Sequence, residues 1–382
     1  MNPYRRMILS GLLIVGCAAG RVEAAALDPT LPLFMAQSQG DVSLTSGSYQ
    51  FELGSNTPSL VYLNGPTFTT VATGFIYNGI NVFDFHSLDI AAGANISTLQ
   101  SAASGPIALL ASTSINMAGS IDVSGGQQYV GSSLGGGPGA GNTGVGGVGG
   151  GVGIPLGGEF GVIVSGGGGG GFGGIGQRGQ DVPYQFGPPL FQSGVAQGGA
   201  GGAHYESLAD HLQGGSAGGL GAGATGYSIL PGAGGLGGGA IELGAVGTVS
   251  VSGSITANGS NGFDALNGVK GPAGGGGGGS GGGVFLHGDS VDLSGTISAL
   301  GGAGGSGRGF NDGGGAGSGG LVLAQYNNAY GTFSDTGTVN VGNDAYAGRF
   351  DVQSVPEPSS LILLGMSALG GVVATGLRCR RR

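Results

Sequence analysis

The stretch Val249-Ser250-Val251-Ser252-Gly253-Ser254-Ile255-Thr256-Ala257-Asn258-Gly259 decides the fold of this chain. Apolar residues alternate with small polar ones on both sides of Gly253, a pattern that predicts two short, half-buried strands joined by a bend. The residues that share the apolar side are Val249, Val251, Ile255 and Ala257. A unit this small cannot cover its own apolar face, so it needs similar units above and below it.

The same pattern occurs four times, at residues 115–125, 249–259, 291–301 and, in degraded form, 333–342. The last three copies are displaced from one another by 42 residues. Most copies follow a short apolar strand, marked by Ile107 and Leu109, Ile241 and Leu243, Val284 and Leu286 and, at a looser spacing, Leu321 and Leu323. Each repeat therefore reads strand, bend, strand and loop, which predicts an all-β chain built as an irregular parallel β-helix or solenoid. The glycine at each bend is expected to serve a corner, where the chain turns sharply.

Glycine supplies 97 of the 382 residues and dominates the loops at 135–157, 166–176, 274–283 and 301–320. Glycine-rich segments are usually flexible, but between stacked strands they can pack as close-set extended chains, and we expect partial order. Residues 126–236 separate the first two copies. They are either one long insertion or eroded repeats, such as the apolar run at 160–164.

Residues 27–100 are poorer in glycine and form the predicted N-terminal cap and first layers. Alternating or apolar runs predict strands at 48–53, 60–63, 68–71 and 82–86. The chain then divides into a signal peptide (1–26), this cap (27–100), the glycine-rich repeats (101–345, with the ambiguous part at 125–236), a linker (346–358), a transmembrane helix (359–377) and a basic cytoplasmic tail (378–382).

Residues 1–26 have the order of a secretory signal peptide: Arg5 and Arg6, an apolar run at 8–20, and a cluster of small residues. Ala24 and Ala26 are both suitable cleavage positions. A second interpretation is that Ile14-Val15-Gly16-Cys17 is a lipobox and that Cys17 is lipidated. The other cysteine, Cys379, lies in the basic tail, so no disulfide is expected in the body of the protein.

The C-terminus combines three features. Residues 359–377 carry no charge and would form a helix of about 28 Å, close to the thickness of a bilayer core. The tail that follows contains Arg378, Arg380, Arg381 and Arg382. By the positive-inside rule these arginines stay in the cytoplasm, which places everything upstream outside.

Together with Val355, Pro356, Glu357 and Pro358, this tail resembles the bacterial PEP-CTERM sorting signal. The resemblance implies export across the inner membrane of a Gram-negative cell that makes exopolysaccharide, and anchoring by the C-terminal helix. It also implies cleavage near the motif by an exosortase, with release or attachment at the cell surface. The two prolines would hold an extended segment just outside the membrane. The alternative is a plain anchor that is never cut.

The body resembles the glycine-rich β-helix regions of bacterial surface proteins, through G-[ST]-I-x-[AV]-x-G units over about residues 83–345. Between residues 27 and 356 there are four Lys and Arg against 18 Asp and Glu, a formal charge of −14. Nucleic acid is thereby excluded as a partner, because phosphate binding needs clustered cations. Divalent cations or neutral polysaccharide suit such a surface better.

Residues that bear chemistry are scattered. His204, Asp210 and His211 form the richest polar patch, which we interpret as a solvated loop. Asp122, Asp289 and Asp292 are interpreted as solubilising charges, with calcium binding as the alternative. No catalytic residue, metal site or cofactor is predicted.

These features predict a non-enzymatic structural or adhesive protein of the cell envelope or extracellular matrix, associated with exopolysaccharide or biofilm. The alternatives are a carbohydrate-active β-helix lyase or hydrolase, and a passive calcium- or glycan-binding surface module.

Overall fold

A computed structural model describes residues 27, 29, 38–98, 104–126, 156–158, 161–185, 193–204, 207–208, 211–223, 230–266, 273–308, 312–327, 331–342 and 346–355. Every regular element in this part of the chain is a β-strand, which confirms the all-β prediction there. Most of the strands lie in two sheets that pair mainly in parallel. The predicted signal and transmembrane helices lie outside the described residues.

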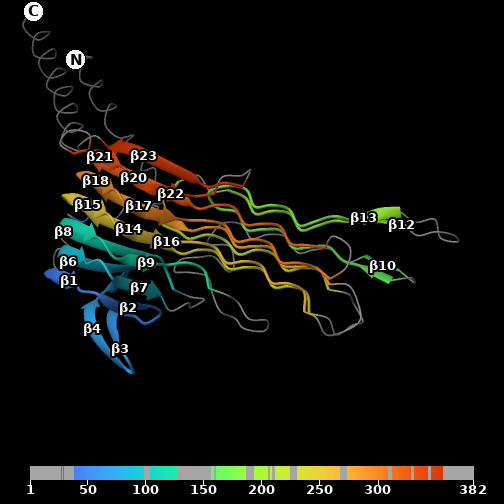
Figure 1. The fold of residues 1–382 in the computed structure, drawn as a ribbon, viewed down its shortest axis with the longest axis horizontal. Coiled ribbons are helices and arrows are strands. Elements are labelled where there is room, and N and C mark those ends of the chain that lie inside the picture. The colour runs from blue at the N-terminus through green and yellow to red at the C-terminus, as the bar shows by residue number, and fades with distance from the viewer. Residues whose placement is uncertain are drawn as a thin grey trace, which may run out of the picture.

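The larger sheet contains β1 (Asp41–Leu44), β5 (Phe75–Tyr77), β6 (Ile80–Ile90), β8 (Ile107–Met117), β14 (Ala240–Ala245), β15 (Thr248–Val251), β17 (Gly283–Gly288), β18 (Ser290–Leu293), β20 (Leu321–Asn327), β21 (Phe333–Asp335) and β23 (Arg349–Val355). The smaller sheet contains β2 (Gly47–Glu52), β3 (Ser59–Asn64), β4 (Thr67–Thr73), β7 (Ala94–Thr98), β9 (Ser120–Asp122), β16 (Ser254–Thr256), β19 (Thr296–Ser298) and β22 (Thr338–Asn340). Figure 1 shows the strands stacked from β1 near one end to β23 at the other.

The larger sheet is curled, and a long strand in it can pair with two shorter strands of the next repeat. The first half of β8 pairs with β14, and its second half pairs with β15. After β15 the chain bends at Gly253 and enters the smaller sheet as β16. One repeat thus contributes three short strands to one layer of the stack: two to the larger sheet and one to the smaller sheet.

The predicted repeats lie side by side in parallel. Ile255 pairs with Ile121 on one side and with Ile297 on the other, and Ile297 pairs with Val339. In the larger sheet Ile115, Val249, Val291 and Phe333 form a second file. The 42-residue displacement in the sequence is therefore the distance from one layer to the next.

The corner glycines also stack on one another. A Cβ built on Gly253 would collide with the carbonyl of Gly119, and one built on Gly295 would collide with that of Gly253. Only glycine allows this close approach of backbone to backbone.

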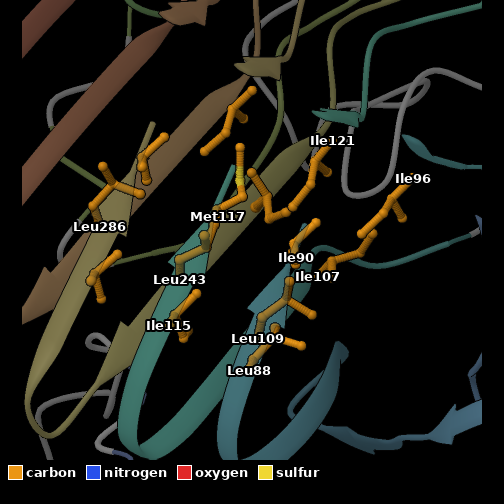
Figure 2. Packing of buried hydrophobic residues seen from close by; sticks show 14 of the residues in the cluster. Leu88, Ile90, Ile96, Ile107, Leu109, Ile115, Met117, Ile121, Leu243 and Leu286 are labelled. Carbon is orange, nitrogen blue, oxygen red and sulfur yellow. The ribbon is translucent and has the colours of Figure 1, made fainter. Parts of the chain in front are cut away.

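The interior between the two sheets is a single aliphatic and aromatic cluster. All four residues predicted to share the apolar side of the deciding stretch, Val249, Val251, Ile255 and Ala257, belong to it and are fully buried. Figure 2 shows Leu88, Ile115 and Leu243 from the larger sheet and Ile96 and Ile121 from the smaller one within the same apolar interior. A layer containing Leu88, Ile90 and Ile96 precedes the first predicted copy. It lies in residues 27–100, where the first layers were predicted without their pairing.

A second apolar cluster covers the outer face of the larger sheet. It includes Leu27, Val82, Leu110, Phe172, Leu208, Leu212, Phe285 and Leu323. Strand β14 is consequently buried on both faces, which explains its nearly continuous apolar sequence Ala-Ile-Glu-Leu-Gly-Ala.

The glycine-rich segments form a bundle that runs away from the strands (Figure 1). We call the segments 164–181, 197–204, 211–223, 230–239, 257–266, 273–282, 299–308 and 312–320 the glycine bundle. Backbone hydrogen bonds between different segments hold the bundle together, and few such bonds form within any one segment. Two antiparallel pairs lie outside the large sheets: β10 (Leu156–Gly158) with β11 (Gly161–Ile163), and β12 (Val182–Gln185) with β13 (Ser193–Ala196).

The segment 274–282 lies at the centre of this bundle. Its successive amides donate to the carbonyls of three different segments in turn: Gly274 to Ala222, Gly275 to Asp312 and Gly276 to Phe263. The next three amides donate to the same three segments in the same order. Its carbonyls accept hydrogen bonds from amides of three further segments, at 232–238, 167–170 and 302–305. A repeat of three residues, with bonds only between chains, is the geometry of the polyproline II helix. Six neighbouring segments leave little room for side chains: within 274–282 only Ser280 has one, and its Oγ accepts the amide of Ser216 at 2.8 Å.

The edges of the bundle are closed by side chains that recur every third residue. The Oδ1 atoms of Asn258, Asn261 and Asp264 accept the amides of Leu300 (2.7 Å), Ala303 (2.9 Å) and Ser306 (2.6 Å). Each donor is 42 residues from its acceptor, so the repeat that sets the strand register also sets the register of the bundle.

The structure adds two details to the sequence-based predictions. Within the apolar run that was one candidate for an eroded repeat, Gly161–Ile163 forms β11, which pairs antiparallel with β10 in a separate two-stranded sheet and not with the stack. Part of the predicted linker at 346–358 is a strand: β23 pairs with β20 over its full length.

Replacing Ile255 by aspartate is expected to unfold the stack, because it puts an unpaired charge between Ile121 and Ile297. We expect the free energy of unfolding to fall by about 4 kcal/mol or more. Urea unfolding followed by circular dichroism measures this. Ser252→Asp, at an exposed position of the same copy, serves as the matched control. Equal stability of both variants would contradict the assigned interior.

Replacing Gly277 by alanine tests the bundle. The new Cβ would collide with the carbonyl of Gly168, and we expect a loss of about 1–3 kcal/mol together with faster hydrogen exchange of the amides at 274–282. Ala303→Leu is the control, since Ala303 lies in a neighbouring chain but is exposed. A harmless Gly277→Ala would show that the chains are not packed this closely.

Candidate functional site

The C-terminal segment leaves the folded body at the end of β23. This strand is the last in the path of the larger sheet, and its residues pair in register with β20 from Arg349 to Val355. Two polar contacts lie along it: Arg349 Nε contacts Asp351 Oδ2 at 2.6 Å, and Gln325 Nε2 donates to Gln353 Oε1 at 3.0 Å. Pro356 follows directly, and a proline cannot donate an amide to extend the ladder.

Of the predicted sorting residues, Val355 is described. It ends β23 with an exposed side chain. Pro356, Glu357, Pro358, the four arginines of the tail, and Ala24 and Ala26 lie outside the described residues, so their individual roles stay predictions. No helix within the described ranges is long and apolar enough to cross a bilayer.

The predicted polar patches are not gathered into one site. His204 and His211 are exposed, and Asp210 lies outside the described residues. Asp122 caps a turn by accepting the amide of Ser124 at 2.9 Å, and Asp289 accepts from Asn327 Nδ2 at 3.2 Å. Among the residues that the structure describes, no group of three His, Cys, Asp or Glu side chains could hold a metal ion.

A surface pair joins β1 to β6. Asp41 Oδ1 lies 2.7 Å from His86 Nδ1 and accepts from Ser87 Oγ at 2.6 Å. The hydrogen bond from Ser87, followed by that from His86, lowers the pKa of Asp41. Because both side chains are exposed, the pair is expected to add little to stability.

A small cavity of about 180 Å³ lies beside β20 and β23. Its lining includes Ser207, Leu208, Leu323 and the paired Arg349 and Asp351. Sites for small organic ligands usually measure about 300–1,000 Å³, so this cavity is below that range.

A model of the PEP-CTERM protein-sorting motif matches residues 354–382. The C-terminus is a PEP-CTERM sorting signal. The match begins within the last two residues of β23 and includes Pro356-Glu357-Pro358. No curated protein and no solved structure matches the chain.

The PEP-CTERM signal means that the protein is exported, anchored in the membrane before processing, and recognised by an exosortase. The matched segment overlaps the last two residues of β23, which are paired with β20. The PEP-CTERM signal therefore begins at the end of the folded body.

One polar pair in the described body was not predicted from the sequence. Glu242 and His287 lie on neighbouring strands, and Glu242 Oε1 is 2.8 Å from His287 Nε2. The available signal was a glutamate within the apolar strand Ala-Ile-Glu-Leu and a histidine ending Val-Phe-Leu-His in the next copy.

Among the residues placed by the structure, two further carboxyls are buried with one oxygen that has no hydrogen-bond partner, Asp84 Oδ2 and Asp312 Oδ2. Burial raises the pKa of Asp84 to about 6, against a smaller opposing hydrogen bond from the Phe85 backbone. Burial also raises the pKa of Asp312.

Asp84 makes the stability of the protein depend on pH. The pKa of an aspartate in the unfolded chain is about 3.9, so between about pH 4 and pH 6 the folded state binds more protons than the unfolded state. The free energy of unfolding should therefore fall by about 2–3 kcal/mol as the pH rises through this window, and Asp84→Asn should remove that fall. Urea unfolding at pH 4 to 8 measures it, with the exposed Asp89→Asn as the control. An unchanged pH profile in Asp84→Asn would contradict the assignment.

Proposed function

We propose that this protein is a non-enzymatic structural or adhesive component of the cell envelope or extracellular matrix of a Gram-negative bacterium, associated with exopolysaccharide or biofilm. The observation that carries the proposal is the sorting signal attached to the end of a stacked, hydrogen-bonded body. Such a body reaches the cell surface and extends from it.

The body suits a mechanical role. We interpret the stacked layers as an irregular parallel β-helix in which each repeat adds three short strands, and from which the glycine bundle projects to one side. Backbone hydrogen bonds hold the bundle together, so its stiffness does not depend on charged side chains that salt would screen.

The surface chemistry supports polysaccharide as the partner class. The central region carries four cationic residues against 18 acidic ones, which disfavours anionic partners such as nucleic acid. Amide and hydroxyl side chains such as Asn261 and Ser306 lie on the exposed edge of the bundle and offer hydrogen bonds to neutral sugars.

Replacing Pro356-Glu357-Pro358 by three alanines tests sorting in the cell that makes the protein. We expect the variant to stay at full length in the inner membrane, because the segment read by the exosortase is gone. Fractionation followed by mass spectrometry of both chain ends measures this. Replacing Ser359-Ser360 by alanines is the control. A triple variant that is processed and exported like the parent would overturn the role of the motif.

The matrix role is tested with the same strains. Cells that lack the protein, or that carry the retained triple variant, should hold less polysaccharide in the matrix fraction than cells with the parent. Equal matrix polysaccharide in all strains would overturn the structural role while leaving the sorting result intact.

A further inference from the structure

Glu242 is a buried carboxylate on the outer face of the larger sheet. Its residue is 1% exposed, and its neighbours in register are Ala108 on β8 and Phe285 on β17. An ionised carboxylate in such apolar surroundings is costly unless a positive charge or several hydrogen bonds compensate it.

Glu242 Oε1 has two partners in the described structure. His287 Nε2 lies 2.8 Å away, and the backbone nitrogen of Leu27 donates at 2.8 Å. The position of His287 depends on Gly244, since a Cβ built there would collide with the histidine ring. The Phe285 ring, from the same strand, lies 5.0 Å from that of His287. The neighbouring residues thus leave a defined place for a donor at Glu242.

Leu27 is fixed from two directions. Its side chain is buried in the outer apolar cluster with Val82, Leu110 and Phe285, and its nitrogen points to Glu242. In the sequence it directly follows Ala24-Ala25-Ala26, a match to the A-x-A pattern read by signal peptidases.

We propose that a signal peptidase cuts between Ala26 and Leu27, and that the new α-amino group of Leu27 docks on Glu242. Hydrolysis of this peptide bond consumes one water and leaves a carboxylate on Ala26 and an amine on Leu27. With an ordinary pKa of about 7.7–8.0, that amine is largely protonated at neutral pH. A neutral amide donor at Glu242 is thereby replaced by a cation, which forms a buried ion pair.

The site distinguishes between the cleavage positions. After a cut behind Ala24, or lipidation at Cys17, the nitrogen of Leu27 would remain a neutral amide, and Glu242 would gain no charge partner beyond His287, which carries a charge only when protonated. A cut behind Ala26 adds a second cationic partner at the place where a donor already lies. Removal of the leader then strengthens the outer apolar cluster, so maturation and final folding are coupled. The inference rests on the proposed export through an N-terminal signal peptide.

The experiment uses the exported protein purified from its own cells and labels primary amines with an N-hydroxysuccinimide acetate. The chain contains a single lysine, Lys270, so the α-amino group and Lys270 are the two amines that compete for the reagent. Mass spectrometry gives both the first residue and the extent of labelling. We expect a chain that begins at Leu27, whose α-amine reacts about tenfold or more slowly in the native protein than in urea, because a hydrogen-bonded buried charge must first be exposed.

Glu242→Gln should raise the native labelling rate of Leu27 about tenfold relative to Lys270, whereas the exposed Glu52→Gln should not. If Glu242→Gln fails to accumulate, the parent alone decides, through its first residue and its protection. A chain that begins at Ala25 or Cys17, or a Leu27 amine that reacts equally fast in native and unfolded protein, would overturn the inference. Either result leaves C-terminal sorting untouched, because that is measured at the other end of the chain.

Discussion

The structure depends on how closely one backbone can approach another when no side chain intervenes. In the glycine bundle, the chain at 274–282 donates to three neighbours and accepts from three others. In the stack, the corner glycines lie directly above one another. At the glycine positions both arrangements leave no room for a Cβ atom, and both satisfy backbone polar groups that would otherwise be buried without partners. The unusual glycine content is thus a packing requirement, although it raises the entropic cost of folding.

Stack and bundle share one register. The Ile255 file pairs at intervals of 42 residues, and so do the side-chain caps from Asn258, Asn261 and Asp264. The position of one layer of strands therefore also fixes the positions of the bundle segments that are connected to it. The aliphatic interior contributes roughly 1.5–3 kcal/mol for each buried large side chain. This burial offsets part of the entropic cost of ordering the glycine bundle, which buries few large side chains of its own, such as Phe172 and Leu212.

The sequence was most informative where side chains alternate. The repeats, their spacing and the inward residues such as Ile255 follow from the pattern alone, because a period of two can face an interior in only one way. The sorting signal was equally legible, since it is a local motif. The pairing of the layer with Leu88 and Ile96 was harder to predict. Ile96 pairs with Ile121, only 25 residues later in the sequence, and this interval does not match the 42-residue period.

The bundle geometry and the Glu242 pair could not be read in advance. A run of glycines has no pattern that states which chains become neighbours, so the order of the six chains around 274–282 emerges only in three dimensions. Glu242, His287 and Leu27 are separated by long intervals in the sequence, and nothing local links them.

The threefold rotation of hydrogen bonds around 274–282 has a mechanical consequence. A β-sheet is bonded along one lateral direction and is held only by side-chain contacts in the other, so layers can slide. The glycine bundle is cross-linked laterally in every direction. It should therefore resist bending and shear to a similar degree in every lateral direction, whereas stacked β-sheets resist shear mainly along their hydrogen bonds.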